Sequence, residues 1–542
     1  MEYNDIAFDY SCSQRINEQF DVITVPRDMN PPLSLNNYPY TAIPKCYGLS
    51  DTQALEASGI FTIQRYPGFE LNGTDVIIGF IDTGIDYRID AFKDASGRSR
   101  IIRIWDQTIP SETPPFDLRF GTEFTKEQIN EALESETPLA IVPSMDEIGH
   151  GTAIASVAAG SFLPAEDFSG AAPKCDIAVV KLKEAKPYLK NFYCIFTDEP
   201  CYQENDIMAG ISYLNALANS LRKPLVVCLG METNMGDHDA GSPLGTLMNQ
   251  IGSGRLRSLV VGTGNEANNG HHYEGNIHSN DNYDNVEIRV DSMTRGFTAE
   301  LWASTPDLFS IAILSPTGEE LPRIPVSRGR MITHRFLFEQ TTVDVEYLFS
   351  SIISGAELIQ IRFRDLAPGI WTIRVYINNR ITGHFNMWLP IKAFLNGNTF
   401  FLKATPDTTL SNLSTVDRAI STGSYDSANN SISIDSGRGY TRLGRIKPEL
   451  CSPGVNVYVA LSGNRFTTRS GGSIAAAICA GAAALIMEWG VTLGNEPFID
   501  AAAIKSILIR GTRTGPLRTY PNRECGYGAL DLYHSFEILR IY

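Results

Sequence analysis

The segment Val76-Ile-Ile-Gly-Phe-Ile-Asp-Thr-Gly84 decides the fold of this chain. Its apolar residues run without alternation, which is typical of a strand that is buried on both faces in a parallel sheet covered by helices. Three shorter apolar runs of the same kind follow at 177–180, 225–227 and 259–261. The sequence therefore predicts an α/β domain built on a mostly parallel sheet.

Helical patterns lie between these predicted strands. After the run 177–180, apolar residues recur at the spacing of one helix face: Ile207, Ile211, Leu214, Leu217 and Leu221. Asp206 precedes them, and a carboxylate can cap the first free backbone N–H groups of a helix. We therefore expect a helix that Asp206 caps, connecting two parallel strands.

The pattern changes between about 285 and 400, where apolar residues alternate with polar ones. Val286, Ile288 and Val290 form one such set, and the alternating segment 371–377 forms another. This period predicts half-buried antiparallel strands. The α/β character resumes after about 405, so we expect an all-β sandwich that interrupts the α/β domain. The predicted organisation is an N-terminal extension (1–45), the first part of the α/β domain (46–280), an inserted β-sandwich (281–405) and the second part of the α/β domain (406–542).

Composition narrows the classes of function. The 542 residues include 45 Lys and Arg against 61 Asp and Glu, a net charge of −16, which is the wrong sign for a protein that binds a nucleic-acid backbone. The longest apolar run, 474–487, is shorter than the roughly 20 residues that span a membrane. The N-terminus lacks a cationic start before an apolar run, so no secretory signal is predicted. We expect a cytoplasmic protein without a membrane span.

The chain contains nine cysteines and no C-x-x-C pair. A zinc ribbon or a thioredoxin-like motif is therefore unsupported. We expect free, mostly buried thiols in a reducing compartment, and no metal or cofactor.

Two polar residues stand where chemistry is plausible. Asp82 ends the first apolar strand, and the carboxyl ends of parallel strands are where α/β sheets bind ligands. His150 lies between glycines in Gly149-His-Gly-Thr152, which allow other backbone to come close to the imidazole. Taken alone, such an Asp is more often a turn or cap residue, and such a His is more often structural.

Two further residues complete the set. Ser473 follows two glycines and opens a helix of small residues, so its amide N–H lies at the positive end of that helix. Asn265 follows the run 259–261, and an uncharged amide donor there suits an oxyanion that develops during acyl transfer. Each signal is weak alone, but the chain order Asp, His, Asn, Ser in glycine contexts makes them support one another.

These motifs resemble those of the subtilisin-like serine peptidases: Asp-Thr-Gly at 82–84, Gly-His-Gly-Thr at 149–152, Gly-Asn-Glu at 264–266 and Gly-Gly-Ser-Ile-Ala at 471–475. The resemblance covers about 46–275 and 406–542, in the triad order of subtilisin. Phrases at 230–239, 270–273 and 445–448 resemble the Clostridial Csp-type subtilases of spore germination, which also carry a jelly-roll insert.

The resemblance implies a subtilisin-like three-layer fold and a serine endopeptidase. Ser473 would be the nucleophile, His150 the general base and then acid, and Asp82 the group that orients the imidazole. Asn265 and the Ser473 amide would form the oxyanion hole. The implied partner is a peptide or protein substrate, and hydrolysis would pass through an acyl-enzyme intermediate.

The resemblance also implies a substrate-binding strand. The backbone of Cys228, Leu229 and Gly230 would pair with an extended peptide, and Gly262, Thr263 and Gly264 would line the site. This chain departs from the family pattern at Cys228 for Ser, Gly472 for Thr and Ala477 for Pro. None of these changes removes a catalytic group, so they bear on rate and specificity.

Other charged residues near these motifs are interpreted as structural and not as metal ligands. The stretch 160–170 lacks the Asn-rich loop that binds calcium in many secreted subtilisins, so we predict no calcium there. Asp86, Asp146 and Glu147 are interpreted as solvated or capping carboxylates. His271 and His272 either line the cleft or form a pair in a loop whose ring nitrogens are hydrogen-bonded within the fold.

Three alternatives stay open at this point. The fold could serve a catalytically silent binding or signalling protein, since some Csp-type members are pseudoproteases. The sandwich could brace the catalytic domain or bind carbohydrate, in which case Trp302, Tyr376 and Trp388 should be exposed on one face. If the protein works as Csp-type members do, it acts on specific protein precursors in germination and is spore-associated.

The segment before the catalytic domain is short and contains several prolines. We expect 1–45 to form a docked extension, with one strand near 20–26, because so short a segment is unsuited to fold alone as a propeptide. A segment removed by autoprocessing is the alternative.

Overall fold

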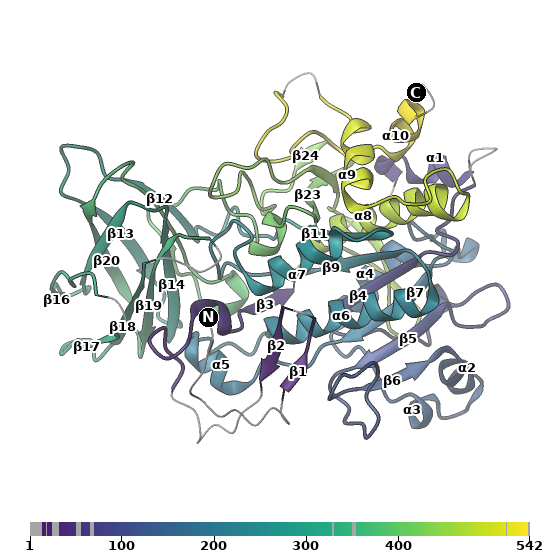
Figure 1. The fold of residues 1–542 in the computed structure, drawn as a ribbon, viewed down its shortest axis with the longest axis horizontal. Coiled ribbons are helices and arrows are strands. Elements are labelled where there is room, and N and C mark those ends of the chain that lie inside the picture. Colours follow the sequence, from purple (N-terminus) through teal and green to yellow (C-terminus); the bar gives the residue numbers. More distant parts are fainter. Residues whose placement is uncertain are drawn as a thin grey trace.

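The structure, a computed structural model, describes residues 13–17, 19–23, 32–49, 56–65, 70–327, 330–349, 354–515 and 518–539. An α/β part and an all-β part lie side by side (Figure 1). The all-β part is formed by the middle of the chain, and both chain segments that flank it belong to the α/β part. The predicted interruption of an α/β domain by an all-β insertion is confirmed.

A nine-stranded sheet forms the centre of the α/β part in the described residues. Its order is β24-β23-β11-β9-β4-β7-β5-β6, with β25 beside β23. These strands are β4 (Ile77–Asp82), β5 (Ile101–Asp106), β6 (Thr122–Thr125), β7 (Asp176–Lys181), β9 (Leu225–Leu229), β11 (Arg257–Gly262), β23 (Ile420–Asp426), β24 (Ser431–Ile432) and β25 (Leu450–Pro453). The pairs from β5 through β23 are parallel, and only β6 and β24 pair antiparallel. All four strands predicted from continuous apolar runs lie in this sheet.

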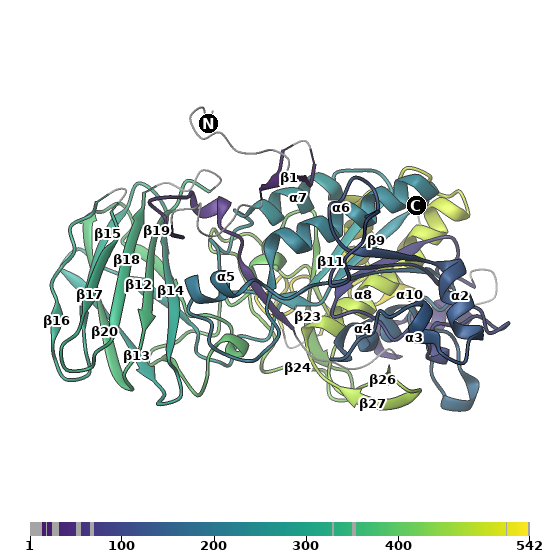
Figure 2. The same cartoon turned by 90° about the horizontal axis from the view of Figure 1, so that it is seen from below.

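Helices cover both faces of the sheet, which explains why the strands are apolar on both sides. Alternate residues of β4 divide between two cores: Ile78 and Phe80 pack on one face, and Ile77 and Ile81 on the other. Figure 2 shows α6 (Glu204–Leu221) and α7 (Pro243–Gly252) above the sheet and α4 (His150–Ala159) and α8 (Gly472–Met487) below it. This is the three-layer arrangement expected of the fold.

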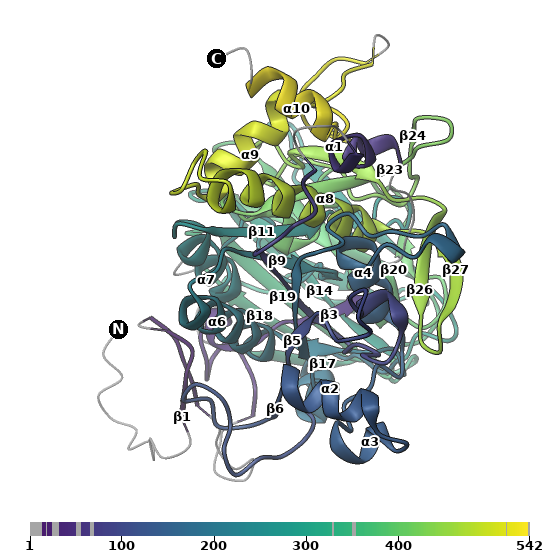
Figure 3. The same cartoon turned by 90° about the vertical axis from the view of Figure 1, so that its right-hand side faces the viewer.

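The remaining helices are short and lie around this core. Seen from the α/β end, α9 (Ala501–Arg510), α10 (Leu532–Leu539) and α1 (Ile60–Arg65) gather beyond α8 (Figure 3). The other short helices are α2 (Lys126–Glu134), α3 (Pro138–Ile141) and α5 (Pro187–Phe192). Helix α6 begins at Glu204, three residues earlier than predicted, so Asp206 is not its cap. Asp206 lies buried in the first turn, where it accepts a 2.7 Å hydrogen bond from Lys183 Nζ.

Helix α8 continues as a π-helical turn at Glu488–Thr492. In the described residues, the segment Gly472–Thr492 is the one helix long and apolar enough to cross a membrane, but 89% of its most apolar window is buried inside the fold. Its small residues allow close packing against α4, β9 and β11. The segment is therefore the central core helix of the α/β part.

The inserted part is a sandwich of two antiparallel sheets. One has the order β12-β21-β14-β19-β18-β17 and the other β16-β15-β20-β13-β22. Their strands are β12 (His272–Asn276), β13 (Tyr283–Val290), β14 (Gly296–Ala303), β15 (Leu308–Leu314), β16 (Glu320–Leu321), β17 (Ile332–Arg335), β18 (Thr342–Leu348), β19 (Glu357–Arg364), β20 (Gly369–Asn379), β21 (His384–Trp388) and β22 (Phe400–Phe401). The alternating residues Val286, Ile288 and Val290 face the shared core, as predicted.

The junction between the two parts is buried and polar. Glu300 on β14 accepts hydrogen bonds from Tyr40 Oη (2.7 Å) and from the backbone N–H of Gly236, which belongs to the α/β part (3.0 Å). His238 of the same loop stacks on Trp388, with ring centroids 3.9 Å apart. Trp302 and Trp388 are each 1% exposed, so the exposed aromatic face required for sugar binding is absent at these two residues. They are buried because they seal the junction.

The described N-terminal residues lie against both parts. Strands β1 (Ser13–Arg15) and β2 (Asp21–Ile23) pair as a hairpin. The Lys45 side chain is completely buried, and its Nζ donates to the carbonyls of Tyr40 and Ile43 at 2.8 Å and lies 3.6 Å from Glu204 Oε2. After it, β3 (Cys46–Leu49) forms the middle of a three-stranded sheet between β8 (Tyr202–Gln203) and β10 (Met231–Glu232).

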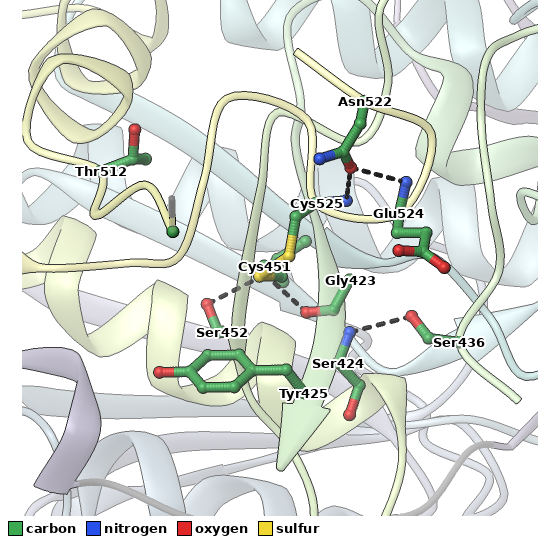
Figure 4. The surroundings of a disulfide bond; sticks show 12 residues. Gly423, Ser424, Tyr425, Ser436, Cys451, Ser452, Thr512, Asn522, Glu524 and Cys525 are labelled. Atoms are coloured by element: carbon green, nitrogen blue, oxygen red, sulfur yellow. Dashed lines mark hydrogen bonds between the residues drawn. A yellow bond between two sulfur atoms is a disulfide. The ribbon is translucent and has the colours of Figure 1, made fainter. Parts of the chain in front are cut away.

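The prediction that all cysteines are free is wrong. Cys451 on β25 and Cys525 form a disulfide whose residues are 74 apart in the sequence (Figure 4). The loop that contains Cys525 is held by Asn522 Oδ1, which accepts from the backbone N–H groups of Glu524 and Cys525. The fold brings the two cysteines together by packing this loop on β25, which no local sequence pattern reveals. Of the other cysteines that the structure describes, six are free and buried: Cys46, Cys175, Cys194, Cys201, Cys228 and Cys479.

Candidate active site

Asp82 and His150 meet at the carboxyl end of β4. Asp82 is the last residue of that strand, and His150 is the first residue of α4, after Gly149 in the left-handed region (φ 84°). His150 Nδ1 lies 2.8 Å from Asp82 Oδ1, and the two residues are 5% and 2% exposed. A buried carboxylate at this distance fixes the orientation of the ring, so that Nε2 is left for chemistry.

Asp146 anchors this pair from behind. Its Oδ1 accepts from Thr83 Oγ1 at 2.7 Å and from Gly149 N–H at 2.8 Å, and its Oδ2 accepts from Thr152 N–H and Oγ1 at 2.8 and 2.7 Å. The carboxylate therefore ties the residue after Asp82 to the first turn of the helix that carries His150. Asp146 was predicted to be a solvated or a capping carboxylate. It is 4% exposed, so it is a capping residue and is not solvated.

Ser473 opens α8 on the opposite side of His150. A Cβ built on Gly230 would lie 3.0 Å from Ser473 Cβ and 3.2 Å from His150 Cε1. Ser473 and His150 thus both border Gly230, and a Cβ there would also lie 2.4 Å from Ile154 Cδ1. Ser473 is fully buried.

Asn265 lies beside the start of the same helix. A Cβ on Gly262, at the end of β11, would come within 2.6 Å of the Gly472 carbonyl oxygen, so this glycine lets α8 approach the strand end. As a result, the Gly472 N–H donates to Asn265 Oδ1 at 3.1 Å. With Oδ1 engaged, Nδ2 is the donor atom of the Asn265 side chain, and that side chain also contacts the Glu232 carboxyl group. The structure therefore brings Asp82, His150, Asn265 and Ser473 together.

The six residues predicted to bind substrate divide into two groups. Cys228 and Leu229 lie within β9, where Cys228 already has partners on both β4 and β11, and burial raises the pKa of the Cys228 thiol. Thr263 is fully buried, and its hydroxyl lies 3.2 Å from Ser436 Oγ. Gly230, Gly262 and Gly264 instead shape the space around Ser473 and Asn265.

The strand edge just beyond Gly230 is occupied by a segment of this chain. There β10 pairs antiparallel with β3, with Leu49 opposite Met231 and Gly48 opposite Glu232. On its other edge β3 pairs antiparallel with β8, with Cys46 opposite Gln203. An extended segment of this chain thus shows how a peptide can add to this edge, with its C-terminal end directed toward Gly230.

Buried carboxyl groups behind Asn265 escaped the sequence analysis. Glu232 Oε2 accepts the Asn265 backbone N–H at 2.6 Å. Glu266 Oε2 lies 2.5 Å from His271 Nδ1, while His271 Nε2 lies 3.1 Å from the Thr399 carbonyl oxygen. His272 is likewise buried, with Nε2 at 2.8 Å from Asn386 Oδ1. The pair at 271–272 is therefore the satisfied loop pair and does not line the cleft.

The described residues contain no group of three or more His, Cys, Asp or Glu side chains that could hold a metal ion. Asp86 pairs with Arg88 at 2.8 Å, and the exposed Glu147 pairs with Lys181 at 2.9 Å. These carboxylates thus have structural partners.

The geometry agrees with a comparison to known families. The model of the subtilase family matches residues 73–295 and 387–528, and the residues between these two segments belong to the sandwich. The chain belongs to the subtilase family of serine peptidases.

Two relatives illustrate the likeness. The solved structure of the Clostridium perfringens CspB protease superposes with a TM-score of 0.80 at 32% sequence identity, covering 89% of this chain and 96% of that chain. The serine protease AprX of Bacillus subtilis (strain 168) is 32% identical over 116 residues, which is 18% of this chain and 25% of AprX. The match to AprX thus spans about a quarter of that protein.

Proposed function

We propose that this protein is a serine endopeptidase in which Asp82, His150 and Ser473 act as a catalytic triad. The Ser473 hydroxyl attacks the peptide carbonyl while His150 Nε2 takes its proton, and His150 then gives that proton to the leaving amine. Asp82 stabilises the imidazolium that forms. Water attacks the acyl-enzyme in the second half of the reaction, with His150 again as the base.

The observation that carries this proposal is the convergence at Gly230. His150, fixed by Asp82, and Ser473 both lie beside Gly230. Asn265 Nδ2 and the Ser473 backbone N–H at the start of α8 would donate to the oxyanion. This arrangement supports peptide-bond hydrolysis over a silent binding role, because binding alone does not require a buried carboxylate behind the histidine.

Peptide substrates would pair beside Gly230, next to the edge that β3 occupies on β10. Because β3 is antiparallel to β10, a substrate in the same direction runs toward Gly230 and presents its scissile bond to Ser473. We propose that residues 1–45 are a docked extension. If so, intact masses of the wild-type protein and of S473A should show the same N-terminus. A wild-type protein trimmed near residue 45 beside an untrimmed mutant would identify an autoprocessed segment instead.

For the biological role we propose cleavage of specific protein precursors, as in spore germination. The likeness to the CspB protease over 89% of the chain supports this choice of class. The absence of a predicted secretory signal is the basis on which we propose a cytoplasmic or spore-associated protein. Cleavage-site profiling of the purified protein on a peptide library would define the substrate class directly.

The test of the enzymatic proposal is the pair S473A and H150A. S473A should lose about 10⁶-fold in kcat, a magnitude taken from subtilisin, a member of the same family. Near-UV circular dichroism checks that the fold is intact. Undiminished turnover in S473A would refute the assignment, and a wild-type protein that cleaves no peptide in the library would favour the silent binding protein.

A further inference from the structure

Glu232 joins two parts of the site that peptide hydrolysis must coordinate. Its backbone lies in β10, opposite Gly48 of β3, two residues after the segment 228–230 that was predicted to pair with substrate. Its side chain turns the other way, and Oε2 accepts the backbone N–H of Asn265 at 2.6 Å. One residue thus contacts both the peptide-binding strand and the loop that carries the oxyanion donor.

The Asn265 residue is held at three points. Besides the Glu232 contact, its carbonyl oxygen accepts from Asn269 Nδ2 at 2.9 Å, and its Oδ1 accepts from Gly472 N–H at 3.1 Å. The Glu232 carboxyl also occupies the space beside Gly264, whose φ is 85°, because a Cβ there would come within 2.6 Å of Oε2. Removing this carboxyl would therefore free the loop at the residue that must aim Nδ2.

The surroundings of Glu232 bear on its charge. Glu232 is 5% exposed, and no ion pair to it is recorded within the part of the chain that the structure describes. The titratable groups that face it are acidic or already engaged: Glu266, which follows β11, Asp435, which follows β24, and His271, which lies before β12 and is paired with Glu266. From β3 it meets Gly48, which has no side chain. Burial, followed by the Glu266 charge, raises the pKa of Glu232 to about 8.

We propose that Glu232 is a positioning residue of the oxyanion hole, which holds the Asn265 main chain through its carboxyl group. This inference rests on the proposed peptidase function. A neutral carboxyl group keeps the hydrogen bond to Asn265 without placing a negative charge beside the developing oxyanion. An ionised Glu232 would raise the energy of the negatively charged transition state, because Coulomb repulsion is strong in a buried site.

The consequence is an alkaline limb in the pH profile. On the acid side, kcat rises as the general base His150 loses its proton. On the alkaline side, kcat should fall as the pH passes through about 8 and Glu232 ionises. Without the Glu232 charge, the profile would stay flat over this range.

The experiment measures kcat and KM from pH 6 to 10 for the parent, E232Q, E232A and the control E357Q. Glu357 is an equally buried carboxyl group in the sandwich, and burial raises its pKa to about 8 as well. E232Q should abolish the alkaline limb and keep most of the parent kcat at pH 7. E232A should lower kcat by about 10- to 100-fold with little change in KM, as expected for a donor that is misplaced. E357Q should keep the alkaline limb of the parent.

Several results would overturn the inference. An alkaline limb that persists unchanged in E232Q would show that Glu232 does not titrate in catalysis. A change confined to KM for substrates with a basic P1 residue would assign Glu232 to specificity instead. If E232A does not fold, the pH profile of E232Q still decides. A parent protein without any turnover would refute the proposed function itself, whereas an active parent with unaffected Glu232 variants would refute this inference alone.

Discussion

His150 Nδ1 lies 2.8 Å from Asp82 Oδ1, although 68 residues separate the two in the chain. The contact exists because β4 ends at Asp82 and α4 begins at His150 on the same side of the sheet. Asp146 fixes both ends of this contact by binding Thr83, Gly149 and Thr152. A rigid pair of this kind supplies an oriented base before any substrate arrives.

Asn265→Ala should lower kcat by about 10²–10³-fold with little change in KM, a size found for the oxyanion donor of subtilisin itself. The reason is that Nδ2 would act on the oxyanion that forms in the transition state and not on the ground-state carbonyl. Steady-state kinetics on one peptide checks it. A large rise in KM at constant kcat would mean that Asn265 only shapes the pocket.

The sandwich and the α/β part should unfold in one transition. Glu300, Tyr40 and Gly236 form a buried hydrogen-bonded junction, and His238 stacks on Trp388 across it. Differential scanning calorimetry should therefore show a single peak, and limited proteolysis should find few cuts at 276–284 or 400–410. Two well-resolved transitions in the parent would contradict the bracing role.

Glu300→Gln tests the same junction locally. It keeps the shape of the side chain but weakens the acceptor for Tyr40 Oη and Gly236 N–H, so it should cost about 1–3 kcal/mol of unfolding free energy. Urea unfolding measures the change. An unchanged midpoint would show that these hydrogen bonds contribute nothing to the docking of the two parts.

The disulfide predicts the thiol count. With Cys451 and Cys525 paired, the denatured protein should react with two fewer equivalents of a thiol reagent before reduction than after it. The C451S/C525S double variant should lose about 2–4 kcal/mol of unfolding free energy, because the link closes a long loop. Nine reactive thiols in protein purified without reductant would contradict the pairing.

Glu357→Gln should make the protein more resistant to alkali. The Glu357 side chain is fully buried, and its pKa of about 8 lies well above that of an unfolded chain. The folded state therefore binds this proton more tightly. The stabilisation is complete below about pH 4.5 and is lost as the pH rises through about 8. The parent should lose stability on the order of 3 kcal/mol from this group between pH 5 and 9, and E357Q should not. Equal losses in both proteins, measured by urea unfolding, would contradict the assignment.

Local sequence patterns predicted part of the fold and of the site. The apolar run before Asp82 indicated a strand. The glycines around His150 and before Ser473 indicated the two site residues without information on long-range contacts. Strand β5 was missed because Arg103 interrupts its apolar run, and its side chain reaches out to Glu123 at the sheet edge. The cap of α6 was misplaced because Asp206 is engaged by Lys183, from a different element.

The rest depended on contacts between distant segments. The pairing of Cys451 with Cys525 arises when a C-terminal loop packs on β25. The role inferred for Glu232 depends on its burial beside Asn265, and a single Glu after Gly230 carries no such signal in the sequence. Trp302 and Trp388 looked like ligand-binding aromatics, but they are buried at a junction that the sequence pattern did not predict.

The most direct test of the central claim is covalent labelling with a fluorophosphonate, followed by intact mass and peptide mapping. Only a serine activated by a base reacts readily with this probe. The wild-type protein should gain one label, mapped to Ser473, while S473A gains none and H150A reacts far more slowly. A wild-type protein that stays unlabelled, or a label at another serine that persists in S473A, would contradict the account.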